Sequence, residues 1–278
     1  MKTKARFYSL IVFIFFLQTV LVSTAFATTR IMPLGDSITE GFNSGELDPD
    51  RQVSYRKALW DKLIAAGYDV DFVGSLDSGS ALFADPDHEG HNGWTDDEIV
   101  NGRPITEPDA GKLDEWLNDR RPDIVLLHIG TNDLDPDPDQ VEDILNVIDA
   151  YSTDTWVILA LIIKRSCLPW VQPCPGDDET TAFNDAVLFM ANGRAGDKIV
   201  IVDMEDGAGI DYHREHVGDM WNDLHPFQYG IGYAKMADEW YSTLEQILLD
   251  PDPDPDPDPP NNSSGGSSGG CFIGTITE

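Results

Sequence analysis

Three mostly apolar runs constrain the fold more than any other feature of this sequence. They are Ile124–Ile129, Thr155–Ile163 and Lys198–Met204. Short runs of this kind are typical of parallel strands that are buried on both faces. The segments between the runs have apolar residues at helical spacing, and strands that alternate with helices are the pattern of an α/β domain. We therefore expect a three-layer α/β/α sandwich.

Two further strands are expected closer to the N-terminus, at Ile31–Leu34 and Asp69–Gly74. Apolar spacing and capping residues predict helices over residues 54–66, 112–118, 141–151, 180–192 and 230–249, and one more that starts after Thr95. Five strands connected in this way order naturally as a flavodoxin-like, mostly parallel, five-stranded sheet.

Residues 1–27 have the pattern of a secretory signal peptide. Cations precede an apolar run from Phe7 to Val22, and Ala-Phe-Ala ends the segment. The apolar run is short for a membrane span. We therefore expect an exported protein, secreted, periplasmic or at the cell surface, whose mature chain begins at Thr28 and does not insert into a membrane.

The C-terminal residues differ in composition from the rest of the chain. Residues 250–270 consist of Pro-Asp repeats followed by a Ser/Gly-rich stretch, neither of which can bury a core. We interpret them as a linker, which leaves residues 28–249 as one domain. Residues 271–278 form a short tail of unknown role. It faintly resembles bacterial C-terminal sorting tails that contain Cys-Phe-Ile, and surface attachment through it is an alternative to a disordered end.

The chain is strongly acidic, with 50 Asp and Glu against 18 Lys and Arg and a formal net charge of −32. Such a charge argues against nucleic acids and anionic membranes as partners, because both would be repelled. It is compatible with a neutral substrate or with a saline habitat, and composition does not separate these two.

Two of the three cysteines, Cys167 and Cys174, bracket a short loop. In an exported protein this spacing predicts a disulfide that closes the loop, with two free thiols as the alternative. Cys271, in the tail, is the odd cysteine.

The first predicted strand ends in Gly35-Asp36-Ser37, followed by a polar turn that could open a helix. This strand–turn–helix arrangement lifts a serine hydroxyl to the carboxyl edge of a sheet, where ligands of α/β proteins bind. A helix behind Ser37 would add unpaired N–H groups, and Asp36 is expected to cap it. Taken alone the signal is weak, because Gly-Asp-Ser is also ordinary turn chemistry.

Three other residues are expected at the same edge of the sheet. Asn132 follows the strand Ile124–Ile129, Gly93 lies in a Gly/Asn turn beyond the second strand, and His225 precedes the last helix. The carboxyl ends of parallel strands meet at one edge, so these residues should lie near Ser37. A serine with a nearby base and preplaced donors is the equipment of acyl transfer.

The segments GDSITEG, HNGWT, GTND and LHP, in this order and spacing, resemble the four sequence blocks of the SGNH (GDSL-type) hydrolase superfamily. The resemblance covers about Arg30 to Leu249 and is greatest to carbohydrate acetylesterases of carbohydrate esterase family 3. It implies Ser37 as nucleophile and His225 as general base. It also implies an oxyanion hole formed by the N–H groups of Ser37 and Gly93 and the side-chain amide of Asn132. No metal or cofactor is implied.

One position departs from the superfamily pattern, which has Asp three residues before the histidine. Here that residue is Asn222, and Asp223 lies two before His225. Three interpretations remain open. Asn222 orients His225 through its side-chain carbonyl, Asp223 takes that role, or Ser37 and His225 act as a dyad.

Other chemically suggestive residues carry less weight. His88-Glu89-Gly90-His91 is one residue short of the HExxH zinc motif and falls in a predicted turn, so a rim or structural role is favoured. Trp94, Trp170 and Trp221 could stack on sugars or pack in the core. The sequence thus predicts an exported serine esterase that acts on acylated carbohydrate. The alternatives are a lipase or thioesterase, and a degenerate, non-catalytic carbohydrate-binding module.

Overall fold

The computed structural model describes residues 28–134, 137–166, 177–213 and 218–249. The predicted signal peptide, linker and tail lie outside these residues, and so do Cys167, Cys174 and Cys271. Export, surface attachment and the disulfide therefore stay predictions.

The core of the domain is a parallel sheet with the strand order β2-β1-β4-β5-β6. Its strands are β1 (Thr29–Gly35), β2 (Val70–Phe72), β4 (Ile124–His128), β5 (Trp156–Leu161) and β6 (Ile199–Asp203). All five predicted strands are present, every neighbouring pair is parallel, and the order is the flavodoxin-like one that the sequence predicts. A two-residue strand, β3 (Glu89–Gly90), also pairs with the end of β1. Of the turn predicted over residues 88–94, residues 89–90 are therefore extended along β1, and the chain turns at residues 92–93.

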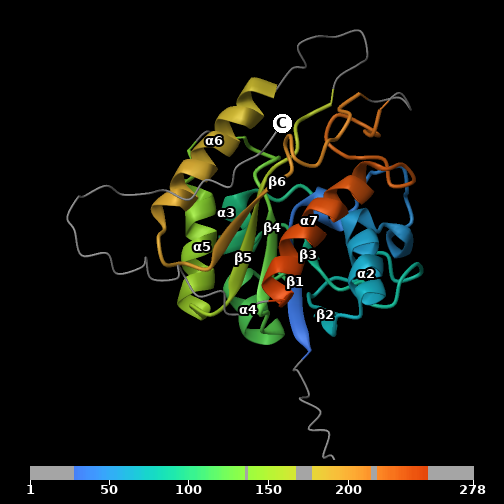
Figure 1. Cartoon of the computed structure of the whole chain (residues 1–278). Coiled ribbons are helices and arrows are strands. Elements are labelled where there is room, and N and C mark those ends of the chain that lie inside the picture. Colours follow the sequence, from blue (N-terminus) through green and yellow to red (C-terminus); the bar gives the residue numbers. More distant parts are fainter. Residues whose placement is uncertain (1–27, 135–136, 167–176, 214–217, 250–278) are drawn as a thin grey trace, which may run out of the picture.

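Helices cover both faces of the sheet, which gives the three layers expected from the sequence (Figure 1). Helices α2 and α7 pack on one face, and α3, α4, α5 and α6 on the other. Their bounds are α2 (Ser54–Ala66), α3 (Asp96–Asn101), α4 (Leu113–Arg120), α5 (Asp139–Tyr151), α6 (Asp177–Gly193) and α7 (Gly232–Leu249). Alternate residues of one strand serve different layers: Ile31 packs with α2 and α7, whereas the adjacent Met32 faces the other layer.

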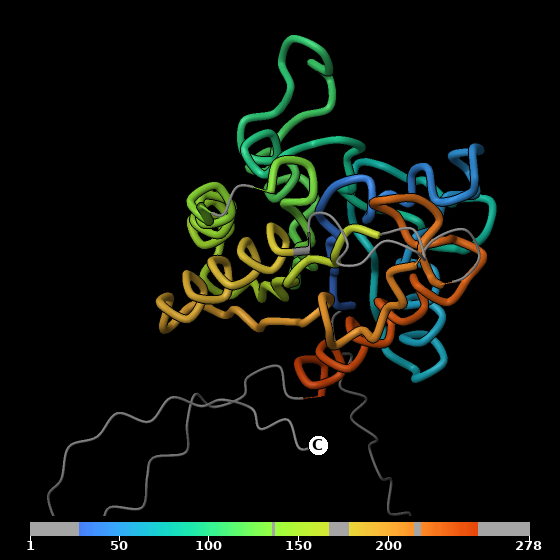
Figure 2. Tube along the Cα trace, turned by 90° about the horizontal axis from the view of Figure 1, so that it is seen from above, coloured from blue at the N-terminus to red at the C-terminus, as the bar shows by residue number. Residues whose placement is uncertain are grey.

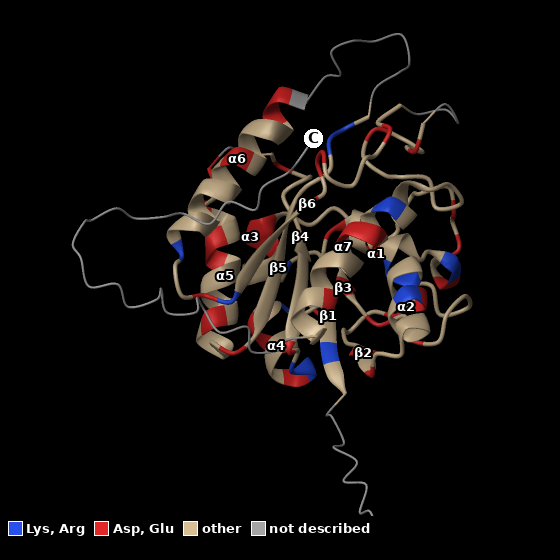
Figure 3. Cartoon of the chain, in the orientation of Figure 1, with Lys and Arg blue, Asp and Glu red and all other residues tan. Residues whose placement is uncertain are grey.

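The loops at the carboxyl edge of the sheet hold the predicted site residues. Seen from above, the segment that follows α1 (Ser37–Glu40) runs beside the segment 218–231, although the two are far apart in sequence (Figure 2). Acidic side chains are distributed over the helices of both layers, with few cations between them (Figure 3). Within the described residues, no helix has the length and apolar character needed to cross a bilayer.

Candidate active site

The turn that carries Ser37 is shaped by a close approach of two strands. A Cβ on Gly35 would lie 2.2 Å from the backbone oxygen of His128 in β4, so only glycine fits at the end of β1. The next residue, Asp36, is the predicted helix cap, and its carboxylate accepts a 2.8 Å hydrogen bond from the Ile38 N–H. Burial raises the pKa of Asp36 to about 7. Helix α1 is only four residues long, so it contributes less of a dipole than a full helix would.

Ser37 is in direct contact with His225. The distance from Ser37 Oγ to His225 Nε2 is 2.9 Å, although 188 residues separate them in sequence. Both side chains are 5% exposed, and burial lowers the pKa of His225 to about 4. A neutral imidazole is therefore maintained at neutral pH, and its Nε2 can accept the serine proton.

The other ring nitrogen of His225 faces Asn222. Asn222 Oδ1 lies 3.0 Å from His225 Nδ1 and also accepts 2.8 Å hydrogen bonds from the backbone N–H groups of Leu224 and His225. Its Nδ2 donates to the Asn43 carbonyl at 2.8 Å. These four contacts allow only one orientation of the amide, with the oxygen toward the histidine. The ring is thereby held as the Nδ1–H tautomer, which leaves Nε2 free to accept from Ser37.

Asp223 does not take this position. It is exposed, and no hydrogen bond joins its carboxylate to a described residue. Burial lowers the pKa of His225 by more than the negative charge of Asp223 raises it. Of the three arrangements considered from the sequence, the structure thus has Asn222 against the ring.

The predicted oxyanion donors lie at the same edge. The pairing of Gly35 with Gly90 and with His128 brings the chain after β3 and the chain after β4 beside Ser37. Among the described residues, no acceptor is hydrogen-bonded to the backbone N–H of Ser37 or Gly93. Asn132 Nδ2 donates one hydrogen to the Trp94 carbonyl at 2.7 Å, and an amide nitrogen has a second hydrogen to offer.

A sequence model of the GDSL-like lipase/acylhydrolase family matches residues 34–230, from β1 through the His225 loop. This chain belongs to that family. Membership makes it a carboxylic ester hydrolase.

Solved structures agree with this assignment. A family 3 carbohydrate esterase from Clostridium thermocellum is 33% identical, with a TM-score of 0.62 over 80% of this chain and 98% of that one. A family 3 carbohydrate esterase from Talaromyces cellulolyticus is 27% identical, with a TM-score of 0.60 over 80% and 99%. An acetyl esterase mutant solved with an acetate ion is 26% identical, with a TM-score of 0.61 over 80% and 99%.

A further relative is also an esterase, and its chain is longer than this one. The multidomain esterase of Ruminococcus flavefaciens is 29% identical over 268 residues. The match covers 89% of this chain but 32% of the relative, so this chain spans about a third of that protein's length.

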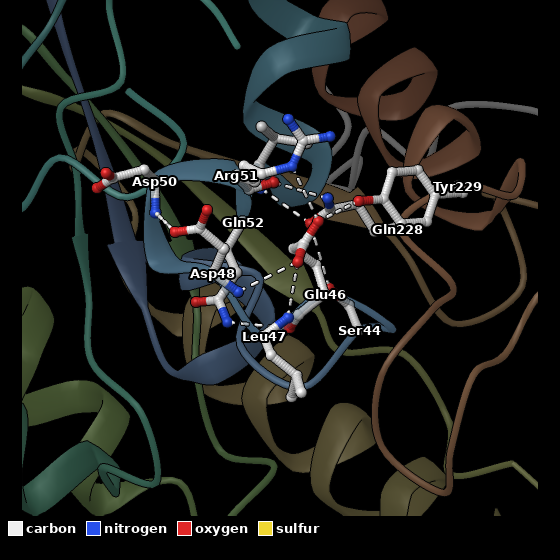
Figure 4. Close-up of polar contacts among 10 residues, drawn as sticks. Ser44, Glu46, Leu47, Asp48, Asp50, Arg51, Gln52, Gln228 and Tyr229 are labelled. Atoms are coloured by element: carbon white, nitrogen blue, oxygen red, sulfur yellow. Dashed lines mark hydrogen bonds and ion pairs between the residues drawn. The ribbon is translucent and has the colours of Figure 1, made fainter. Parts of the chain in front are cut away.

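In this GDSL-family domain, the segment after the nucleophile helix is tied to the histidine loop by a dense set of hydrogen bonds (Figure 4). Gln228 is the central residue. Its Oε1 accepts from the Val53 N–H at 3.1 Å, its Nε2 donates to the Arg51 carbonyl at 2.7 Å, and its backbone N–H donates to the Ser44 carbonyl at 2.8 Å. The two loops that carry Ser37 and His225 are therefore held as one unit.

Glu46 strengthens this contact between loops. Its carboxylate accepts from the Tyr229 hydroxyl and from Arg51 Nε, the latter at 3.2 Å. These donors, with backbone N–H groups of residues 47 and 48, lower the pKa of Glu46 to about 2. In the sequence, residues 46–52 are a mostly polar stretch. No motif marks it, because its partners come from the other end of the chain.

The His88–His91 segment is structural. Glu89 is fully buried and is bonded to Ser75 and, at 3.0 Å, to His91 Nε2. Within the described residues, no group of three or more His, Cys, Asp or Glu side chains is arranged to hold a metal ion. The prediction of a rim or structural role at this segment is consistent with this packing.

Two arginines near the site carry no sequence signal. Arg56 is fully buried beneath α1 and donates to backbone carbonyls, including those of Thr39 and Glu40 at 2.9 Å. It therefore satisfies the last carbonyls of the nucleophile helix, and burial lowers its pKa to about 10. Arg103 contacts the carbonyl of Gly93. Both arginines bind backbone carbonyls, which carry no residue-specific signal in the sequence.

Proposed function

We propose that this esterase is an exported serine hydrolase that removes small acyl groups, acetyl in particular, from carbohydrate. One observation carries the proposal: Ser37 Oγ lies 2.9 Å from His225 Nε2, while His225 Nδ1 faces the Asn222 carbonyl oxygen at 3.0 Å. This is the nucleophile–base–orienting-residue arrangement of acyl transfer.

The proposed reaction follows from this geometry. Ser37 Oγ attacks the ester carbonyl carbon while His225 Nε2 takes the hydroxyl proton. The N–H groups of Ser37 and Gly93 and the free amide hydrogen of Asn132 receive the resulting oxyanion. The tetrahedral intermediate collapses, the sugar oxygen leaves with the proton from His225, and an acyl-serine remains. Water, deprotonated by His225, then attacks the acyl-serine, releases the carboxylic acid and restores Ser37.

Asn222 sets a limit on this reaction. It fixes the histidine tautomer as an aspartate would, but it is neutral and does not stabilise the imidazolium that forms in each step. We therefore expect lower turnover than an aspartate at this position would support. The base in return stays unprotonated to more acidic pH.

Three observations favour carbohydrate over lipid as the substrate: the identity of the relatives, exposed aromatic residues and a polar cavity. The solved relatives with the highest identities quoted above are carbohydrate esterases. In the histidine loop, residues Trp221 and Tyr229 are 39% and 54% exposed, and aromatic side chains of this kind stack on sugars. Trp94, by contrast, is fully buried and serves the core.

The third feature is a cavity of about 550 Å³ that reaches Asn92 and Glu40 beside the site, without Ser37 or His225 in its lining. Its walls carry several carboxylates, which accept hydrogen bonds from the hydroxyl groups of a sugar. Export remains an inference from the composition of residues 1–27, and surface attachment an inference from residues 271–278.

The test compares substrates on the full mature chain. We expect acetate release from acetylated xylan and hydrolysis of p-nitrophenyl acetate, with activity that falls steeply as the acyl chain lengthens. Ser37→Ala is the control and should lack both activities. Preference for long acyl chains would indicate a lipase, thioester preference a thioesterase, and a complete absence of hydrolysis by the folded wild type a binding module.

A further inference from the structure

Arg103 lies ten residues beyond Gly93 and reaches back to it. Its Nη2 donates to the Gly93 carbonyl and, at 2.7 Å, to Glu98 Oε2, while its Nη1 donates to Glu107 Oε1 at 3.0 Å. The side chain is 20% exposed, so the guanidinium is largely enclosed by its partners. The planar fork of an arginine is suited to hold several acceptors at fixed angles.

The same guanidinium covers the ring of the next residue, Trp94. The centre of the guanidinium lies 5.4 Å from the ring centroid, and Trp94 Nε1 donates to Glu107 Oε2 at 3.2 Å. The indole also stacks on His91, with ring centroids 4.4 Å apart. Trp94 is thereby immobilised, and its carbonyl oxygen is the one that accepts from Asn132 Nδ2.

We propose that Arg103 is the positioning residue of the oxyanion hole, which sets the Gly93 donor directly and the Asn132 donor through Trp94. This inference rests on the proposed function, in which Gly93 and Asn132 stabilise the oxyanion. Arg103 itself does not touch the reacting atoms.

The need for such a residue follows from the backbone at Gly93. Its φ is +72°, a value that favours glycine, and a Cβ built on it would meet only Arg103, at 4.0 Å. Glycine has little intrinsic preference among backbone conformations, and this one is exposed. The hydrogen bond from Arg103 to its carbonyl therefore supplies the restraint that packing does not.

Arg103 acts through geometry and not through its charge. Glu98 and Glu107 both pair with the guanidinium, and their hydrogen bonds raise its pKa above the ordinary arginine value. The group is therefore always protonated, but two carboxylates offset its field at the oxyanion. Its contribution should depend on the number and angle of its hydrogen bonds.

The test is Arg103→Gln in the full mature chain, assayed with p-nitrophenyl acetate. Misplaced donors should lower kcat by about 10- to 100-fold, with KM changed by less than about threefold. Arg103→Lys, which keeps the charge but loses the fork, should resemble Arg103→Gln. Affinity for a boronic acid that forms a tetrahedral adduct with Ser37 should fall in parallel with kcat, a change that a purely structural role would not produce.

Arg194→Gln is the matched control. Arg194 also bonds two carboxylates, Asp197 at 2.7 Å and Glu142 at 3.3 Å, but at the end of α6, away from the site. Its kcat should stay within about twofold of wild type. If Arg103→Gln fails to fold, Glu107→Gln breaks one arm of the same cluster and should lower kcat a few-fold.

The inference is overturned if folded Arg103→Gln keeps the wild-type kcat, or if its boronic acid affinity is unchanged while kcat falls. If Arg103→Gln does not fold, a wild-type kcat in Glu107→Gln overturns it. A wild-type enzyme without activity on p-nitrophenyl acetate would instead reject the proposed function, which keeps the two failures distinct.

Discussion

The two sides of the candidate site are held by different kinds of interaction. On the donor side, residues 91–103 and Asn132, the backbone is held by an arginine that pairs with Glu98 and Glu107 and by stacked rings. On the base side, residues 218–229 and 42–53, His225 itself is held by neutral hydrogen bonds that centre on Asn222 and Gln228. The charged group on this side, Glu46, pairs with Arg51 and Tyr229 and is not bonded to the ring.

This difference separates two requirements of acyl transfer. The donor side must keep N–H groups fixed in space, and charge-assisted bonds are strong enough to do so for an exposed glycine loop. The base side must orient a ring whose proton moves in each cycle. Neutral partners orient the ring without raising the pKa of His225, so the base stays available at low pH.

The largest effect is expected on the donor side, in Asn132→Ala. Loss of one oxyanion donor typically lowers kcat by about 10²- to 10³-fold, and Asn132 also anchors the Trp94 carbonyl. Steady-state kinetics with p-nitrophenyl acetate measures the loss. Asn118→Ala, which removes an exposed amide bonded to the Asp114 carbonyl on α4, is the control and should change little. A kcat near wild type in folded Asn132→Ala would mean that this amide does not face the oxyanion.

A smaller effect is expected on the base side, in Gln228→Ala. The change removes the side-chain bonds to Val53 and Arg51 and loosens the loop that carries His225. We expect kcat to fall about three- to tenfold and the free energy of unfolding to fall by about 1 kcal/mol. Urea denaturation and kinetics measure the two.

Gln246→Ala serves as the comparison for Gln228→Ala, because Gln246 donates only to the Ser242 carbonyl one turn earlier in α7. Equal losses of activity in the two variants would rule out a positional role for the side chain of Gln228.

The sequence predicts more of the sheet than of the loops. The apolar runs around Val125 and Ile158 encode buried parallel strands directly, and all five predicted strands are present in a flavodoxin-like order. Strand β3 escapes prediction because two residues, Glu89 and Gly90, are too few to show a period. Its place is set by pairing with the end of β1.

The residues of the candidate site likewise include some that the sequence predicts and one that it leaves open. The motifs name Ser37, Gly93, Asn132 and His225, and the structure brings them to one edge of the sheet. Spacing alone leaves the orienting residue open, because two adjacent positions are compatible with it. Asn222 is distinguished by contacts with the Asn43 carbonyl and with backbone N–H groups, and no sequence pattern encodes contacts across 179 residues.

The central claim is that Ser37 is activated by a His225 that a neutral Asn222 orients. The most direct test is the pH dependence of Ser37 labelling by a fluorophosphonate, with the modified residue identified by peptide mass spectrometry and the fold monitored by circular dichroism. In wild type, labelling should occur on Ser37, depend on His225, and decline only as the pH falls through about 4, where the ring becomes protonated.

Asn222→Asp places a negative charge beside Nδ1 and should move the midpoint up by about 1 unit or more. Its labelling rate at neutral pH should rise, but only a few-fold, because a carboxylate cannot donate to the Asn43 carbonyl as Asn222 does. Labelling at another residue, or a wild-type midpoint near 6.5 that Asn222→Asp does not move, would contradict the account.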